Sequence, residues 1–195
     1  MTVHVIVLNG GSSSGKSSLA RSLQETLPEP WLTFGVDTLI DAMPPALVDG
    51  PGSGIDVADD GSIAVGDTFR QLDTAWSLGI AAMARAGTRI VVDDVFLGGP
   101  ASQERWRTAL AGLDVLWVGV HCAPEVAAAR EAVRGDRTPG MAAIQALAVH
   151  HGITYDLEID TATTDPTACA RLIADRLDRR GRSSGPGGPQ TTAAR

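Results

Sequence analysis

The stretch that decides the fold is residues 3–17, VHVIVLNGGSSSGKS. Its mostly apolar first half, residues 3–8, is typical of a strand buried on both faces of a parallel sheet. The second half matches the pattern G-x-x-x-x-G-K-[ST], and Leu19, Leu23 and Leu27 then form one stripe of a helix. A strand, a glycine-rich turn and a helix in this order predict a loop that binds nucleotide phosphates.

Each residue type in this loop suits phosphate binding. Glycines let the backbone curl so that successive N–H groups face one concavity, which the helix N-terminus completes as an anion site. We expect Lys16 to be catalytic by contacting the β- and γ-phosphates of ATP, and Ser17 to coordinate Mg²⁺. Lys16 is the only lysine among 16 basic residues, so a chance match at this position is improbable. The expected nucleotide-binding residues of the loop are Gly10, Gly11, Ser12, Ser13, Ser14, Gly15, Lys16, Ser17 and Ser18.

Strand-like and helix-like segments alternate along the rest of the chain. Its 195 residues, 44% hydrophobic and 20% charged, have the size and composition of one globular domain. We expect strands at 3–8, 31–36, 89–92, 114–120 and 156–159, and a small hairpin at 55–57 and 63–65. The expected helices are 17–27, 37–43, 68–86, 101–111, 124–134, 141–150 and 165–179. This order predicts an α/β sandwich with a mostly parallel sheet.

Acidic residues follow two of the expected strands and so lie at the carboxyl edge of the sheet, where ligands bind in such folds. Asp93 and Asp94 end the strand 89–92, and we expect Asp93 to be a second magnesium ligand. The alternative is a solvated pair that caps the next turn. Asp37 follows the strand 31–36 and could accept the proton of an attacking hydroxyl. It could equally be the N-cap of the next helix, and the residues alone leave both roles open.

Arg130, Arg134 and Arg137 are spaced at i, i+4 and i+7 and run into a break at 134–140. Arginines on such a segment can close over a nucleotide and stabilise charge on the transferred phosphoryl group. We therefore expect a lid at about residues 130–140, with Arg134 and Arg137 binding the nucleotide and Arg137 also catalytic. The alternative is a solvated helix face on which the arginines pair with Glu131 and Asp136.

Composition excludes several other classes. A net charge of −7 gives no overall positive charge with which to bind nucleic acid or an anionic membrane. No apolar run is long enough to span a bilayer. The [NT]-K-x-D motif with which GTPases bind guanine is absent, because no second lysine exists. Two cysteines and no signal peptide indicate a reduced, cytoplasmic protein. We expect one domain over residues 1–180 and a disordered tail over the Gly-, Pro- and Ser-rich segment 181–195.

Two neighbouring pairs that contain histidine are weaker candidates. His121 and Cys122 follow a strand, but two ligands do not make a metal site. His150 and His151 end the helix 141–150, where histidine is a favourable partner for the helix dipole.

Seven blocks of the chain resemble the chloramphenicol phosphotransferases of antibiotic-producing actinomycetes: LNGGSSSGKS, PEPWLTFGVDTLIDAMP, RIVVDDVFLGG, QERWR, LDVLWVGV, RGDR and YDLEID. The likeness runs from about residue 3 to residue 177 and is weakest at 46–67. The FGVDTLIDAMP and VVDDVFLGG blocks are particular to that group. The resemblance implies a P-loop nucleotide-kinase-like fold with a five-stranded parallel sheet. It also implies transfer of the γ-phosphate of ATP to the primary hydroxyl of chloramphenicol.

The resemblance gives Asp37 the role of catalytic base and implies a small-molecule acceptor beside it. An aromatic acceptor needs an apolar wall, and the expected acceptor-binding residues are Val36, Asp37, Met43, Trp76, Asp93 and Phe96. Trp76 could instead belong to the core. Two other functions stay open: a kinase of the same fold for another hydroxylated metabolite or antibiotic, and a regulatory protein that binds ATP without transferring phosphate.

Overall fold

The computed structural model describes residues 3–48, 54–57, 63–134 and 140–183. Five of its strands form one parallel sheet in the order β2-β5-β1-β6-β7. These strands are β1 (Val5–Asn9), β2 (Trp31–Gly35), β5 (Arg89–Asp94), β6 (Val115–His121) and β7 (Leu157–Asp160). The predicted α/β class with a five-stranded parallel sheet is confirmed.

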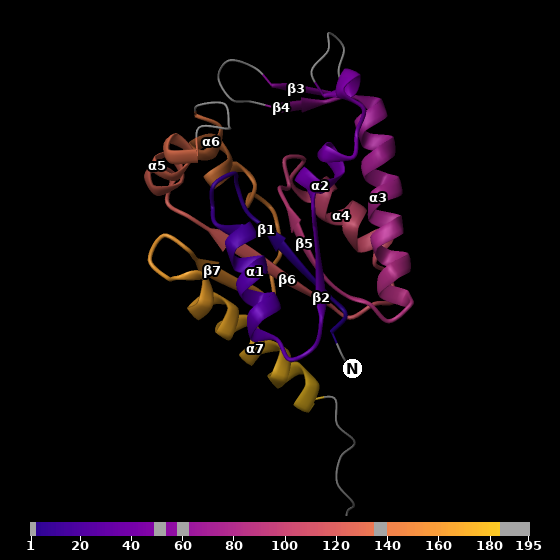
Figure 1. Cartoon of the computed structure of the whole chain (residues 1–195), viewed down its shortest axis with the longest axis vertical. Helices are drawn as coiled ribbons and strands as arrows, with labels where there is room; N and C mark the ends of the chain where they lie inside the picture. Colours follow the sequence, from indigo (N-terminus) through magenta and orange to yellow (C-terminus); the bar gives the residue numbers. More distant parts are fainter. Residues whose placement is uncertain (1–2, 49–53, 58–62, 135–139, 184–195) are drawn as a thin grey trace, which may run out of the picture.

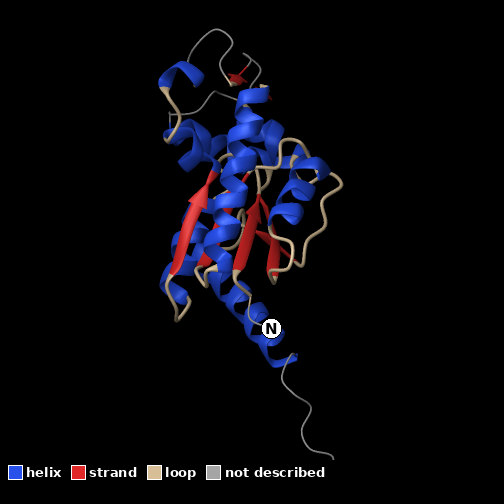
Figure 2. Cartoon of the chain, turned by 90° about the vertical axis from the view of Figure 1, so that its right-hand side faces the viewer, coloured by secondary structure: helices blue, strands red, loops and turns tan. Residues whose placement is uncertain are grey.

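Helices cover both faces of the sheet, as Figures 1 and 2 show. One layer is made by α1 (Lys16–Thr26) and α7 (Pro166–Ser183), the other by α3 (Asp67–Arg85) and α4 (Pro100–Ala109). Alternate residues of β1 belong to two separate apolar cores, with Ile6 and Leu8 in one and Val5 and Val7 in the other. A strand buried on both faces therefore supplies the centre of a three-layer sandwich.

The remaining elements gather near the carboxyl ends of the strands, in the upper part of Figure 1. They are α2 (Val36–Asp41), the short 3₁₀ helix η1 (Pro45–Leu47), the antiparallel pair β3 (Ile55–Val57) and β4 (Ile63–Val65), α5 (Pro124–Arg134) and α6 (Met141–Ala148). The bounds of the hairpin and of α5 are those predicted from the sequence. Because parallel strands all end at the same edge, the loops that follow them meet there.

The helix α7 runs farther than predicted. It continues to Ser183 and so includes the first three residues of the segment 181–195 that we expected to be a disordered tail. The guanidinium of Arg180 donates to the carbonyl oxygen of Val115 at 2.9 Å and bonds the carboxylate of Asp156. These contacts tie the last turns of the helix to the sheet. Residues 184–195 lie outside the described part of the chain.

The packing of β6 against Tyr155 generates a stability prediction. A Cβ at Gly119 would lie 2.8 Å from two ring carbons of Tyr155, whose hydroxyl is held by Asn9 and His150. We expect Gly119→Ala to lower the free energy of unfolding by about 1–3 kcal/mol through overpacking. The matched control is Gly79→Ala in α3, where nothing lies within 4 Å of the added methyl group. That variant should gain about 0.5–1 kcal/mol from helix propensity. Urea denaturation measures both, and equal effects would contradict the assigned packing.

Candidate active site

The glycine-rich loop joins β1 to α1 and curls as its sequence predicts. Gly15 has φ of 90° and Ser13 has φ of 57°, so two residues adopt left-handed conformations within one turn. Gly10 must lack a side chain for another reason, because a Cβ there would lie 2.5 Å from the carbonyl oxygen of Val120. The loop therefore sits directly on β6 and presents its amides at the start of a helix, which is the geometry of an anion site.

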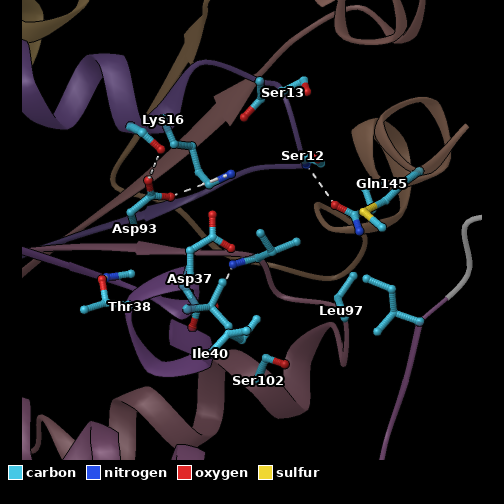
Figure 3. Close-up of a pocket in the computed structure, with 18 of the residues that line it drawn as sticks. Ser12, Ser13, Lys16, Asp37, Thr38, Ile40, Asp93, Leu97, Ser102 and Gln145 are labelled. Atoms are coloured by element: carbon cyan, nitrogen blue, oxygen red, sulfur yellow. Dashed lines mark hydrogen bonds and ion pairs between the residues drawn. The ribbon is translucent and has the colours of Figure 1, made fainter. Parts of the chain in front are cut away.

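Asp93 joins the two reactive side chains of this loop. Lys16 is buried, donates from Nζ to the Gly11 carbonyl oxygen at 2.8 Å, and lies 3.7 Å from Asp93 Oδ1. The Ser17 hydroxyl donates to Asp93 Oδ2 at 2.8 Å. Figure 3 shows the Lys16 and Asp93 side chains side by side. As expected, a carboxylate at the end of β5, that of Asp93, lies against the loop.

Asp94 has a different place. It is buried, accepts the indole N–H of Trp106 at 2.5 Å and accepts the backbone N–H of Val95 at 2.7 Å. Neighbouring residues of a strand point to opposite faces, so only one of the two aspartates can face the loop. Asp93 is the one that does, and Asp94 fixes α4 against β5.

Asp37 lies in the first turn of α2 and its exposed carboxylate lines the same cavity as Lys16. In Figure 3 the Asp37 carboxylate points toward the side that holds Lys16 and Asp93. The N-cap alternative is wrong, because Gly35 is the N-cap and Thr38 Oγ1 accepts the Gly35 N–H at 3.2 Å. The helix starts without needing the Asp37 side chain as its cap.

Two of the three spaced arginines are described. Arg130 donates to the Thr161 carbonyl oxygen at 2.7 Å and to Cys122 Sγ at 3.4 Å, which holds it against the loop beside Gly15. Arg134 is exposed at the end of α5 and lines the cavity, whereas Arg137 and Asp136 lie outside the described residues.

The expected alternative partner of these arginines, Glu131, has another role. It is buried and accepts the backbone N–H groups of Gly140 and Ala142, each at 2.8 Å. Glu131 therefore caps α6 and fixes how α6 follows α5.

The cavity in front of the loop has a volume of about 1590 Å³. This exceeds the roughly 300–1,000 Å³ of common single-ligand sites, so it has room for a nucleotide and a second small molecule. Beyond Asp37 its wall is apolar and comes from α2, the end of η1, the hairpin and the start of α3: Val36, Ile40, Val48, Ile55, Ile63, Val65 and Phe69.

Of the four apolar residues expected to form this wall, Val36 alone lines the cavity. Phe96 is 1% exposed and Met43 is 8% exposed, so both lie in the core. Trp76 packs edge-on against Phe34 with 5.8 Å between ring centres. The core alternative for Trp76 is the one that the packing supports, and the hairpin supplies the wall instead.

Sequence reasoning missed several polar residues that line the cavity, among them Gln145, Asp73 and Arg105. Gln145 accepts the backbone N–H of Ser12 at 2.8 Å, and Figure 3 shows this bond between α6 and the loop. Asp73 and Arg105 form an ion pair of 2.9 Å between α3 and α4. Burial raises the pKa of Asp73 to about 6, against the opposing effect of Arg105. The signal in the sequence was an aspartate within the buried stripe of the helix 68–86.

The comparisons with known proteins agree with this geometry. Residues 3–178 match the family model described as chloramphenicol phosphotransferase-like protein. The chain belongs to the chloramphenicol phosphotransferase-like family. Two Mycobacterium tuberculosis proteins, from strains CDC 1551 and H37Rv and provisionally named as O-phosphotransferases, are each 34% identical over 180 residues. The match covers 87% of this chain and 80% of each relative. The chain is an O-phosphotransferase with the kinase fold.

Solved structures show the same fold at low identity. The adenylylsulfate (APS) kinase of Mycobacterium tuberculosis, solved with AMPPNP and APS, has a TM-score of 0.65 and 16% identity over 91% of this chain and 98% of that one. A gluconokinase of Sinorhizobium meliloti has a TM-score of 0.58 and 19% identity, with 95% and 100% covered. The family member described here therefore shares the architecture of small-molecule kinases.

Two negative findings concern the described residues. Within the ranges given above, no group of three or more His, Cys, Asp or Glu side chains is placed to hold a metal ion by itself. No helix in that part of the chain is long and apolar enough to cross a membrane.

A network of half-buried polar and aromatic side chains adjoins Asn9, the last residue before the loop of this phosphotransferase. His150 bonds the Tyr155 hydroxyl through Nδ1 at 2.7 Å and stacks on His121, with ring centres 3.9 Å apart. His121 in turn bonds Glu158 at 2.8 Å. The expectation that His150 serves the dipole of α6 is wrong. Its ring is packed between β6 and Tyr155, and burial, with His121 nearby, lowers its pKa to about 4.

The lowered pKa of His150 predicts a pH dependence of stability. Between pH 6.5 and about 4 the unfolded chain binds a proton that the folded His150 does not, so stability falls as the pH falls through this range. His150→Gln keeps a hydrogen-bond partner for Tyr155 and removes the titrating ring. Its free energy of unfolding should therefore decrease less between pH 6.5 and 4 than that of the wild type. The exposed neighbour His151, changed to Gln, is the control, and a His150→Gln slope equal to the wild-type slope would contradict the burial of a neutral ring.

Proposed function

We propose that this phosphotransferase transfers the γ-phosphate of ATP to a hydroxyl of a small-molecule antibiotic, with the primary hydroxyl of chloramphenicol as the first acceptor to test. The observation that carries the proposal is one cavity with two halves. A phosphate loop with Lys16 and Asp93 forms one half, and Asp37 with an apolar wall forms the other. ATP is a cytoplasmic metabolite, so the proposal places the reaction in the cytoplasm.

The donor half is supported by the loop and its partners. The loop amides and Lys16 would neutralise the β- and γ-phosphate oxygens, and Arg134, at the rim, would add positive charge near the transferred group. We propose the same for Arg137, from its spacing in the sequence. Arg130, one turn earlier on the same helix, lies beside Gly15 and would contact the nucleotide there.

Mg²⁺ fits the pair Ser17 and Asp93. A hydroxyl and a carboxylate oxygen already meet at 2.8 Å, and hard oxygen ligands are those that this ion prefers. Ser17 would bind the ion directly and Asp93 would hold it directly or through water. When bound, the ion supplies charge neutralisation to the phosphate oxygens.

Asp37 is proposed as the residue that positions and deprotonates the acceptor. Its carboxylate would accept the hydroxyl proton while the oxygen forms a bond to the γ-phosphorus and the bond from that phosphorus to the ADP oxygen breaks. The apolar wall would hold an aromatic ring next to it. A protein that only binds ATP would need neither feature, which is why we favour catalysis over a regulatory role.

An acceptor panel tests the proposal. Purified protein, Mg²⁺ and ATP labelled at the γ-phosphate are incubated with chloramphenicol and with other hydroxylated antibiotics, sugars and shikimate-like acids. Label on the primary hydroxyl of chloramphenicol supports the proposal. Transfer to a different compound with none to chloramphenicol would replace the acceptor while keeping the reaction, and no transfer to any compound would contradict it.

Changing Asp37 to Asn isolates the role of its carboxylate. The amide keeps the size of the side chain and lacks the proton acceptor, so kcat should fall by about 10²-fold or more with little change in the free energy of unfolding. Asp41→Asn is the matched control, because Asp41 is exposed on the same helix and does not line the cavity. Normal turnover by Asp37→Asn would remove Asp37 from the mechanism.

Changing Lys16 to Ala removes the only lysine of the chain. Its ammonium lies against the loop at the Gly11 carbonyl oxygen, so phosphoryl transfer should drop below detection while the circular dichroism spectrum stays that of the wild type. Arg171→Ala, an exposed change on α7, controls for loss of a positive charge. Turnover retained by Lys16→Ala would contradict the assignment of the loop.

A further inference from the structure

Asp73 and Arg105 form a charged contact that the proposed transfer does not use. Asp73 Oδ2 and Arg105 Nη2 are 2.9 Å apart, and both residues line the cavity. The side chains are 12% and 29% exposed, so the pair is mostly withdrawn from solvent but open to the cavity. It joins α3 to α4, which are separate segments of the chain.

The pair has unused hydrogen-bonding capacity. Arg105 Nε is buried without a hydrogen-bond partner among the described residues, and the other carboxylate oxygen of Asp73 makes no hydrogen bond with any of them. Removing two charges from water is costly, and an apolar pair of similar size often stabilises a fold as well. A partly buried ion pair with free donors and acceptors in a cavity therefore points to a ligand.

The pair lies on the acceptor side of the cavity. Ser102 and Arg105 are three residues apart on α4 and so share one face of that helix. In the view of Figure 3, Asp37 is drawn between Lys16 on one side and Ile40 and Ser102 on the other. Phe69, one turn before Asp73 on α3, belongs to the apolar wall. An acceptor whose hydroxyl reaches Asp37 would extend from there toward Asp73 and Arg105.

We propose that Asp73 and Arg105 together bind a second polar group of the acceptor, a neutral group that both donates and accepts a hydrogen bond, such as an amide. This inference rests on the proposed function, because it assumes an acceptor that reaches Asp37. The amide N–H would donate to Asp73 and the amide oxygen would accept from Arg105. The pair thereby selects acceptors by charge as well as shape.

The selection follows from the neutrality of the pair. A carboxylate at this place on the acceptor would face Asp73, and an ammonium would face Arg105, so each meets a like charge in a partly desolvated site. A neutral amide meets neither penalty. The apolar wall, to which Ile55 and Val65 belong, would take the apolar part of the same molecule.

Three compounds that share one skeleton test this selection. Chloramphenicol carries a neutral dichloroacetamide on its amine, its N-succinyl analogue carries a carboxylate there, and the free amine carries an ammonium. Binding of each is measured by calorimetry without ATP, so that turnover does not enter. We expect the wild type to bind the neutral amide at least about tenfold more tightly than either charged analogue.

The variants should shift this order in opposite directions. In Asp73→Asn the unpaired Arg105 should tighten binding of the N-succinyl analogue by about tenfold, and in Arg105→Gln the unpaired Asp73 should do the same for the free amine. Glu29→Gln and Arg89→Gln are the matched controls, since they break an ion pair elsewhere with the same change of charge. Both controls should keep the wild-type order.

A double variant, Asp73→Asn with Arg105→Gln, protects the test against misfolding of the single variants. It removes both charges at similar volume. Its affinities for the two charged analogues should therefore differ less than they do in either single variant. The inference is overturned if none of the three compounds binds the wild type, or if the folded variants keep the wild-type order. Failure of the proposed function gives a different result: the compounds bind in the predicted order and the variants shift that order as expected, but no labelled phosphate appears on chloramphenicol.

Discussion

The structure depends on a single buried amide side chain at the end of the central strand. Asn9 donates from Nδ2 to the Val149 carbonyl oxygen at 2.8 Å and to the Tyr155 hydroxyl at 2.6 Å, and its Oδ1 accepts the Phe96 N–H at 2.8 Å. These bonds join the segments that follow β5 and α6 to the last residue before the phosphate loop. A buried amide left without partners would cost about 1–3 kcal/mol per group, so the three segments are held in one arrangement.

Further bonds fix the loop that begins one residue later. Thr161 bonds the Ser14 carbonyl oxygen from the segment after β7, Gln145 accepts from Ser12, and Lys16 bonds the Gly11 carbonyl oxygen. Each comes from a segment that the sheet brings to its carboxyl edge. The cost of ordering the phosphate site is thereby met during folding, and little reorganisation is left for the moment of binding. His150 also belongs to this network, because its ring bonds the same Tyr155 hydroxyl that Asn9 contacts.

Features that depend on a few consecutive residues could be predicted from the sequence, whereas contacts between separate elements could not. The loop, the five strands and the position of Asp93 at a strand end depend on a few consecutive residues, and their patterns could be recognised. The apolar stripe of α3 was recognised as well, but periodicity does not say which of its residues face the sheet and which face a cavity. Trp76 was assigned to the acceptor wall for that reason, although it packs on Phe34. Asp73 was passed over because its partner Arg105 is on another helix.

The two halves of the cavity also differ in whether neighbouring or distant residues of the sequence form them. The proposed donor half is built mainly from one short motif, which Asp93 joins from the end of a strand, so short stretches of sequence are enough to define it. The acceptor half is built from single side chains of α2, the hairpin, α3 and α4, which only the fold brings together. Substitutions on that side can therefore change the acceptor without touching the chemistry of transfer. In the sequence analysis the likeness to the family is weakest at residues 46–67, and described parts of that segment, Val48, Ile55, Ile63 and Val65, supply much of the wall. Substitutions in this segment would therefore alter the surface that we propose for the acceptor and leave the phosphate loop as it is.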